Sequence, residues 1–175
     1  MLIFLVGYMG CGKSTIGGWL AKRFEAAFID TDHLIEQIEG CSIAELFASK
    51  GEEYFRQLEH KTISELNSEA NITIVATGGG APCHLSNMDT MNSRGLTVYL
   101  SNTPKQLARQ LEHGKSKRPL IKDLNQEQLE DFIASALEQR NPYYQQAKLI
   151  VDCYGCSNEY IANHIKRYID FSAKK

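Results

Sequence analysis

Eight residues near the N-terminus have the types and the spacing that phosphate binding requires. The stretch Gly7-Tyr-Met-Gly-Cys-Gly12-Lys13-Ser14 fits the pattern G-x-x-x-x-G-K-[ST] and directly follows the apolar residues 2–6. Its glycines let backbone N–H groups point toward phosphate oxygens, and the helix expected after it adds a partial positive charge. Lys13 would meet the β- and γ-phosphates, and the Ser14 hydroxyl is suited to bind magnesium. The pattern predicts nucleotide binding, which GTPases, motor ATPases and small-molecule kinases have in common.

Two carboxylates form the next candidate group. Asp30 and Asp32 follow the apolar pair Phe28-Ile29, which we interpret as part of a strand. Because the ligands of a parallel sheet gather outside the carboxyl ends of its strands, both side chains should face the phosphate loop. One carboxylate would help to hold the magnesium shell, and the other would accept the proton of an attacking hydroxyl. The alternative is an N-cap for a helix at residues 33–39, a role that Asp32 could combine with chemistry.

An arginine–glutamate pair and a run of glycines come next along the chain. Arg56 and Glu59 lie three residues apart in the helix expected at residues 52–66, so they share a face and can support one another. Such a pair, taken alone, is typical of a solvated helix face. Thr77-Gly78-Gly79-Gly80 follows the strand expected at residues 72–76. Three glycines allow a ligand to approach the backbone closely, although a flexible turn is the alternative.

Arg140 stands at the end of a further expected helix, at residues 126–140. It precedes Asn-Pro-Tyr-Tyr144, and we expect Pro142 to enforce the end of the helix. The arginine would either bind a ligand or only interact with the dipole at the helix C-terminus.

Residues 112–123 have neither the period of a helix nor that of a strand. They read Glu-His-Gly-Lys-Ser-Lys-Arg-Pro-Leu-Ile-Lys-Asp. A polar loop of this length inside a compact domain is often an active-site lid, and we expect a lid at about residues 112–124. A solvated loop without a function is the alternative.

The elements that must position these residues alternate along the chain. Apolar runs predict strands at residues 2–6, 72–76, 96–100 and 149–151, with a weaker one at 28–29. Helical periods lie between them at residues 13–24, 52–66, 104–111 and 126–140, and Ser42-Ile-Ala-Glu45 is a capping box that opens a further short helix. Continuous apolar strands that alternate with helices predict a parallel sheet covered on both faces. The 175 residues fit a single α/β domain, residues 1–175, without repeats or linkers.

Taken together, these motifs resemble those of shikimate kinases. The resemblance runs from Gly7 to Tyr144, and it rests on the phosphate loop, Asp30/Asp32, Phe55-Arg56-x-x-Glu59, Gly78-Gly79-Gly80, Lys117-Arg118-Pro119-Leu120 and Arg140-x-Pro-x-Tyr144. It implies a three-layer P-loop kinase fold with a five-stranded parallel sheet in the order 2-3-1-4-5 and a mobile lid. The implied reaction is transfer of phosphate from ATP, with Mg²⁺, to the 3-hydroxyl of shikimate, a step toward chorismate and the aromatic amino acids.

The resemblance also implies roles in the substrate pocket. Asp32 would bind the substrate's hydroxyls and act as the base. Arg56 and Arg140 would clamp the shikimate carboxylate, a task that suits the guanidinium fork, and Glu59 would support them. The backbone contacts to the substrate would come from Gly78, Gly79 and Gly80.

For the nucleotide, the resemblance implies a second set of roles. Lys13 and Arg118 would be catalytic residues, and Arg118 would swing onto the phosphates with the lid. Ser14 would bind the metal, and Asp30 would orient a water bound to it. Arg109 lies about where the family places a cation against adenine, and the polar residues 153–158 would cover the other side of the base. The ATP-binding residues implied are Gly10, Cys11, Gly12, Lys13, Ser14, Thr15, Arg109 and Arg118.

Composition limits the partners and the location. The formal net charge of −2 argues against nucleic-acid binding, which needs excess cations. No segment approaches the roughly 20 apolar residues that cross a bilayer, so we expect a cytoplasmic monomer without a membrane partner. Five cysteines fit reduced thiols, and we interpret Cys153-x-x-Cys156 as neither a metal site nor a redox site. Cys11 is interpreted as a small filler residue, with oxidative inhibition as the alternative.

Two other functions would fit parts of this pattern. A kinase for gluconate or another sugar acid could use the same scaffold, although Arg56, Arg140 and the glycine run favour shikimate. A nucleotide-dependent switch would need no metabolite, but the chain lacks the guanine signature Asn-Lys-x-Asp. The arginines and aspartates expected beside the γ-phosphate also favour a kinase over a switch.

Overall fold

The structure is a computed structural model that describes residues 1–68, 71–112, 114–115, 118 and 120–172. Lys117 and Pro119, which belong to the predicted lid motif, lie outside the described residues. In the described part of the chain, no helix is both long and apolar enough to cross a membrane.

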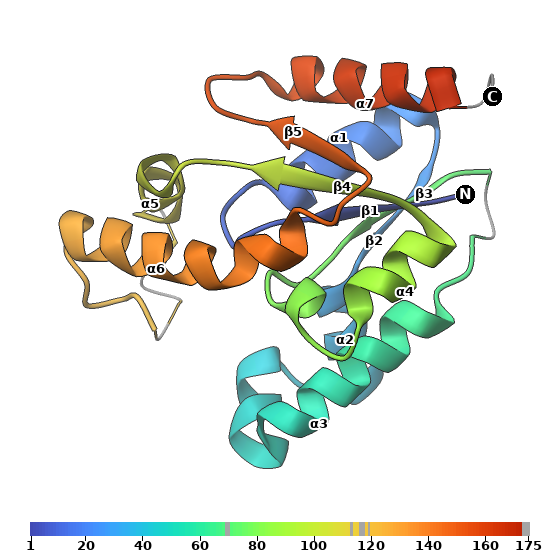
Figure 1. Cartoon of the computed structure of the whole chain (residues 1–175). Coiled ribbons are helices and arrows are strands. Elements are labelled where there is room, and N and C mark those ends of the chain that lie inside the picture. Colours follow the sequence, from blue (N-terminus) through green and yellow to red (C-terminus); the bar gives the residue numbers. More distant parts are fainter. Residues whose placement is uncertain (69–70, 113, 116–117, 119, 173–175) are drawn as a thin grey trace.

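Five parallel strands form one sheet in the order β2-β3-β1-β4-β5, which confirms the predicted topology (Figure 1). The strands are β1 (Leu2–Val6), β2 (Ala27–Asp30), β3 (Thr73–Ala76), β4 (Gly95–Ser101) and β5 (Leu149–Asp152). β1 is central and every one of its residues is buried. Its continuous apolar sequence is what a strand covered on both faces requires.

The helices cover both faces of this sheet. In Figure 1, α1 (Lys13–Phe24) and α7 (Asn158–Ser172) lie together on one face, and α4 (Asn87–Arg94) and α6 (Gln126–Tyr144) lie on the other. The remaining elements are α2 (Thr31–Glu39), α3 (Ile43–Glu65), the short 3₁₀ helix η1 (Ala81–Cys83) and α5 (Pro104–Glu112). α3 packs against α2 and α4, and α5 packs against α6. The helix pairs thus give the three-layer architecture that the sequence predicts.

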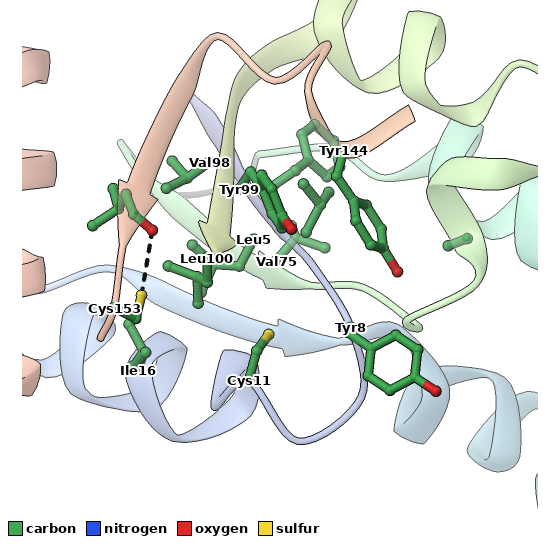
Figure 2. Packing of buried hydrophobic residues seen from close by; sticks show 14 of the residues in the cluster. Leu5, Tyr8, Cys11, Ile16, Val75, Val98, Tyr99, Leu100, Tyr144 and Cys153 are labelled. Carbon is green, nitrogen blue, oxygen red and sulfur yellow. Dashed lines mark hydrogen bonds between the residues drawn. The ribbon is translucent and has the colours of Figure 1, made fainter. Parts of the chain in front are cut away.

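One large cluster of buried side chains forms the core between sheet and helices. It includes Tyr99 and Tyr144, whose ring centroids lie 5.0 Å apart in a tilted arrangement (Figure 2). Cys11 is only 2% exposed and belongs to the same cluster. Its burial favours the interpretation of Cys11 as a filler residue.

Two predicted helix boundaries differ from the structure by two or more residues. The helix expected at residues 33–39 begins at Thr31, and Asp30 rather than Asp32 is its N-cap. The short helix that opens at the capping box of Ser42 and the helix expected at residues 52–66 are both present within α3, because Gly51, with a φ of 81° and a ψ of 172°, separates two helical segments.

The second boundary concerns Pro142, which does not end α6. Proline has the φ of a helix, so its cost is a missing N–H donor and a clash with the preceding turn. Side chains on both sides of Pro142 are held by the core, because the Tyr99 hydroxyl donates to Asn141 Oδ1 and Tyr144 is fully buried. These contacts carry the helix one further turn, to Tyr144.

Candidate active site

The carboxyl ends of three neighbouring strands meet at one cavity of about 310 Å³. β1 leads into the phosphate loop, β2 into Asp30, and β3 into the segment that begins at Thr77. The cavity is lined by Met9, Gly10, Gly12, Lys13, Ser14, Thr15, Asp30, Asp32, Thr77, Gly79 and Arg118. The parallel topology therefore gathers residues that lie up to about a hundred positions apart in the sequence.

The phosphate loop has the backbone that its glycines predict. Gly12 has a φ of 90° and Gly10 a φ of 82°, values that L side chains rarely adopt. Lys13 lies inside the loop, where its Nζ donates to the carbonyl oxygens of Gly7 (2.7 Å) and Tyr8 (2.9 Å). The ammonium is thus fixed at the cavity wall, 8% exposed. A phosphate in the cavity would lie next to this cation and the N-terminus of α1.

Ser14 and Asp30 form a pair of oxygen ligands on that wall. The Ser14 hydroxyl donates to Asp30 Oδ2 at 2.6 Å, and Asp30 Oδ1 accepts from the Asp32 backbone N–H at 3.1 Å. A hydroxyl and a carboxylate are hard donors of the kind that Mg²⁺ prefers, and Mg²⁺ usually keeps several waters beside one or two such protein ligands. The donor set at this point fits magnesium.

Asp32 lies in the same cavity, against the glycine segment after β3. Burial raises the pKa of its carboxyl, and the nearby charge of Asp30 raises it further, while Lys13 acts in the opposite direction. A carboxylate whose pKa is raised binds a proton more readily, which is the property required of a general base. In addition, Asp32 Oδ1 lies 2.9 Å from the position that a Cβ at Gly78 would occupy.

Arg56 is held between two glutamates. Its Nη1 donates to Glu59 Oε2 at 3.0 Å, and its Nε and Nη2 donate to Glu52 Oε1. Glu59 is fully buried, and burial raises its pKa to about 7 although Arg56 lowers it. Glu59 Oε1 has no hydrogen-bond partner in the described part of the chain. The predicted pair therefore exists, but it lies inside the protein and not on a solvated helix face.

The glycine run packs directly on these side chains. A Cβ at Gly78 would lie 2.6 Å from Glu59 Oε1, and a Cβ at Gly80 would lie 3.0 Å from Arg56 Nη1. The Gly78 N–H donates to Thr31 Oγ1 at 3.1 Å, and the Gly79 carbonyl accepts from the Tyr144 hydroxyl at 2.6 Å. Because each glycine has close neighbours, the segment is a fitted surface and not a loose turn.

Arg140 and Arg118 reach the site from α6 and from the lid segment. The Arg140 guanidinium carbon lies 5.3 Å from the centroid of the Tyr8 ring. Burial raises the pKa of Tyr8, and both arginines lower it, so the two cations act on the same residue. Burial likewise raises the pKa of Cys83, which Arg140 and Arg56 lower. The structure thus places the three site arginines around one region beside the cavity.

The structure separates Arg109 from the other residues predicted to bind ATP. Arg109 is exposed on α5 and lines neither the phosphate cavity nor a second cavity of about 280 Å³ on the other side of the phosphate loop. This second cavity is lined by Gly10, Cys11, Gly12, Thr15, Ile16, Asn102, Gln106, Gln110, Cys153, Cys156, Asn158 and Ile161. The expected position of the loop 153–158 beside a nucleotide pocket fits this arrangement, and an adenine contact from Arg109 stays a prediction.

Several residues in or around the site were not predicted from the sequence. Tyr8 lies inside the phosphate-loop pattern at a position where any residue is allowed, and Thr31 lies between the two aspartates, so neither carried a signal. Nothing in the sequence indicates the second partner of Tyr144, whose hydroxyl holds the Gly79 carbonyl. Asn102 carried a usable signal, because it is a polar residue two positions after the strand predicted at 96–100. Side chains that follow the carboxyl ends of parallel strands face the ligand, and this rule, which selects Asp30, also selects Asn102.

The described residues contain no cluster of three or more His, Cys, Asp or Glu side chains that could hold a metal. Cys153 and Cys156 are free thiols, and burial raises the pKa of Cys153 to about 12. A thiol that stays protonated is a poor nucleophile and a poor metal ligand. Burial therefore makes Cys153 an unreactive thiol, and the absence of a metal role for Cys153-x-x-Cys156 stays a prediction.

Comparison with known proteins places these features in a family. The family model for shikimate kinase matches residues 9–170. Shikimate kinase of Parabacteroides distasonis is 45% identical over 150 residues, which cover 86% of each chain, and that of Phocaeicola vulgatus is 44% identical over 83% of each chain. The crystal structure of shikimate kinase from Bacteroides thetaiotaomicron superposes with a TM-score of 0.87 at 36% identity, covering 97% of this chain and 98% of that one. The enzyme from Acinetobacter baumannii in complex with shikimate gives 0.83 at 31% identity, covering 99% and 95%.

Proposed function

This chain belongs to the shikimate kinase family, and from that premise we propose how its own residues carry out the reaction. The chain transfers the γ-phosphate of ATP to the 3-hydroxyl of shikimate, giving shikimate 3-phosphate and ADP. One observation supports the assignment of roles more than any other. Lys13, Asp32 and Arg118 line a single cavity, beside which the partly buried Arg56 forms an ion pair with the buried Glu59.

Shikimate is held at its carboxylate by Arg56 and Arg140. Two guanidinium forks suit a planar anion. Both charges lower the pKa of the half-buried Cys83 thiol, so the two arginines lie near one point, which supports a shared anion site. Glu59 fixes the direction of Arg56 through the 3.0 Å ion pair. The backbone of Gly78, Gly79 and Gly80 forms the adjoining surface, where a side chain at Gly78 or Gly80 would crowd Glu59 or Arg56.

Asp32 is the base in this proposal. It accepts the proton of the 3-hydroxyl while the hydroxyl oxygen attacks the γ-phosphorus, and its raised pKa suits that task. Lys13 and Arg118 stabilise the charge on the transferring phosphoryl group. Ser14, together with Asp30 through a water, would hold Mg²⁺, which neutralises phosphate charge when bound. Transfer then depends mainly on positioning and on electrostatics.

We extend the proposal to the whole molecule. The 175 residues form one P-loop kinase domain that works as a monomer in the cytoplasm, without nucleic-acid or membrane partners. The net charge of −2 and the lack of a membrane-spanning helix in the described part of the chain support this view.

ADP release tests the function directly. We expect steady ADP release when ATP, magnesium and shikimate are all present, and only background release when shikimate is left out. Replacing shikimate with gluconate should also give background release. Turnover with gluconate, or ADP release that ignores the acid, would contradict the assignment.

A further inference from the structure

The second cavity contains polar atoms that the protein leaves without partners. Asn102 is 9% exposed, and both its Nδ2 and its Oδ1 lack a hydrogen-bond partner within the described residues. The same holds for Oε1 of Gln106, which lies four positions further along. Both residues line the cavity of about 280 Å³. Buried polar groups are nearly always hydrogen-bonded in native proteins, so three orphaned atoms on one wall point to a missing partner.

Helix capping does not explain Asn102. The residue lies between the end of β4 and the start of α5, where an asparagine often caps a helix. Here the cap is Thr103, whose Oγ1 accepts from the Gln106 backbone N–H at 3.3 Å. The Asn102 amide is therefore available for a ligand.

The position of the cavity indicates which part of a ligand would enter it. Gly10, Gly12 and Thr15 line both this cavity and the phosphate cavity, so the two adjoin through the phosphate loop. The phosphate cavity continues toward Asp32 and Gly79, on the side of the phosphate acceptor. A nucleotide with its phosphates at the loop must place its nucleoside on the opposite side, where Asn102 and Gln106 lie.

The orphaned atoms match one purine. They comprise two acceptors, Asn102 Oδ1 and Gln106 Oε1, and one donor, Asn102 Nδ2. The adenine edge offers an amino group with two N–H donors beside a ring nitrogen that accepts, and an asparagine amide pairs with it through two bonds. Guanine in the same orientation would place a carbonyl oxygen against the two acceptors.

We propose that Asn102 and Gln106 read the amino group and the adjacent ring nitrogen of adenine and thereby make this kinase select ATP over GTP. The inference rests on the proposed function, because it takes the phosphate loop as the site of the donor nucleotide. It assigns base recognition to the end of β4 and the first turn of α5.

The test compares Asn102→Leu and Gln106→Leu with a control variant, Gln110→Leu. The control makes the same glutamine-to-leucine change four positions after Gln106 on α5, at an exposed amide that lines the same cavity. The KM for ATP and for GTP is measured at saturating shikimate. Asn102→Leu should raise the KM for ATP roughly 5- to 100-fold, the range of one bidentate base contact, with little change in kcat. The ratio of the KM for GTP to the KM for ATP should fall by a similar factor in Asn102→Leu and by a smaller factor in Gln106→Leu. It should stay at the parent value in Gln110→Leu.

Thermal unfolding without nucleotide separates binding from structure. Removing an orphaned amide should leave the melting temperature unchanged or raise it, because no hydrogen bond of the free protein is lost. A lower melting temperature with an unchanged ATP/GTP ratio would make Asn102 structural and overturn the inference. So would an equal loss of preference in Gln110→Leu. If Asn102→Leu does not fold, Asn102→Asp, which keeps the shape and removes the donor, gives the same comparison. Failure of the parent enzyme to phosphorylate shikimate with any nucleotide would instead contradict the proposed function.

Discussion

The Tyr144 hydroxyl donates a 2.6 Å hydrogen bond to the carbonyl oxygen of Gly79, which joins the last turn of α6 to the glycine segment after β3. Tyr144 has no exposed surface, and burial raises the pKa of its phenol, so the hydroxyl stays protonated and remains a donor. One bond thus connects the helix that carries Arg140 with the segment proposed to contact shikimate.

Tyr144→Phe should loosen that connection. Leaving the Gly79 carbonyl without its partner should cost about 1–3 kcal/mol of stability, and the KM for shikimate should rise several-fold while the KM for ATP stays nearly constant. Tyr99→Phe is the matched control, because it removes the hydroxyl of the neighbouring ring, which donates to Asn141 instead. An equal rise in the shikimate KM for both variants would mean that the ring pair matters and the Gly79 bond does not.

Arg56→Ala and Arg140→Ala should each weaken shikimate binding by roughly 1.5–3 kcal/mol and leave ATP affinity nearly unchanged. Lysine at either position should recover little, because a point charge cannot replace the fork. Calorimetric titration with shikimate measures the loss, and Arg23→Ala on the exposed end of α1 serves as the control. A variant that binds shikimate with wild-type affinity would show that its arginine does not contact shikimate.

Asp32→Asn should lower kcat by about 10²–10⁴-fold, the usual contribution of a general base, with a smaller effect on shikimate binding. Asp30→Asn should instead shift the magnesium requirement, since its partner is the proposed metal site. It should remain stable, because asparagine caps helices as well as aspartate does. Measuring kcat across a magnesium titration separates the two. If Asp32→Asn keeps more than about a tenth of the turnover, Asp32 is not the base.

Arg118→Ala should lower kcat much more than it weakens ATP binding. Arg118 lines the phosphate cavity but comes from the segment predicted to be a lid, so we expect its charge to act mainly in the transition state. Turnover at saturating ATP and the ATP dissociation constant are compared in the same preparation. Intact kcat with weaker ATP binding would limit Arg118 to ground-state binding.

Glu59 should make stability depend on pH. Its pKa rises from 4.5 in the unfolded chain to about 7, so the folded state binds more protons between these values. The contribution of Glu59 protonation to the free energy of unfolding is therefore complete below pH 4.5 and is lost as the pH rises through 7. This contribution has a limit of roughly 3 kcal/mol. The free energy of unfolding, measured with urea at pH 5 and at pH 8, should differ less between the two pH values for Glu59→Gln than for the parent. Glu52→Gln, at the exposed partner of Arg56, should behave like the parent, and an identical difference in all three proteins would contradict the assignment.

The sequence by itself determined the features that short stretches encode. The phosphate loop, the boundaries of β1 and α1, the capping box at Ser42 and the parallel sheet all follow from glycine conformation, strand hydrophobicity and local hydrogen bonds. Asp30 could be placed near Ser14 because the carboxyl ends of parallel strands share one edge of the sheet.

Tertiary structure alone decided which polar side chains are buried and what they contact. The Tyr144–Gly79 bond joins residues 65 positions apart, and the depth of Glu59 depends on how α3 packs. The same applies to Pro142, which lies inside α6 because the core holds the side chains around it. Hydrophobic pattern says which face of an element is buried, but a single polar atom gains or lacks a partner only when distant elements are placed to within about an ångström. For this reason the unpartnered amides of Asn102 and Gln106 appear only in the folded chain.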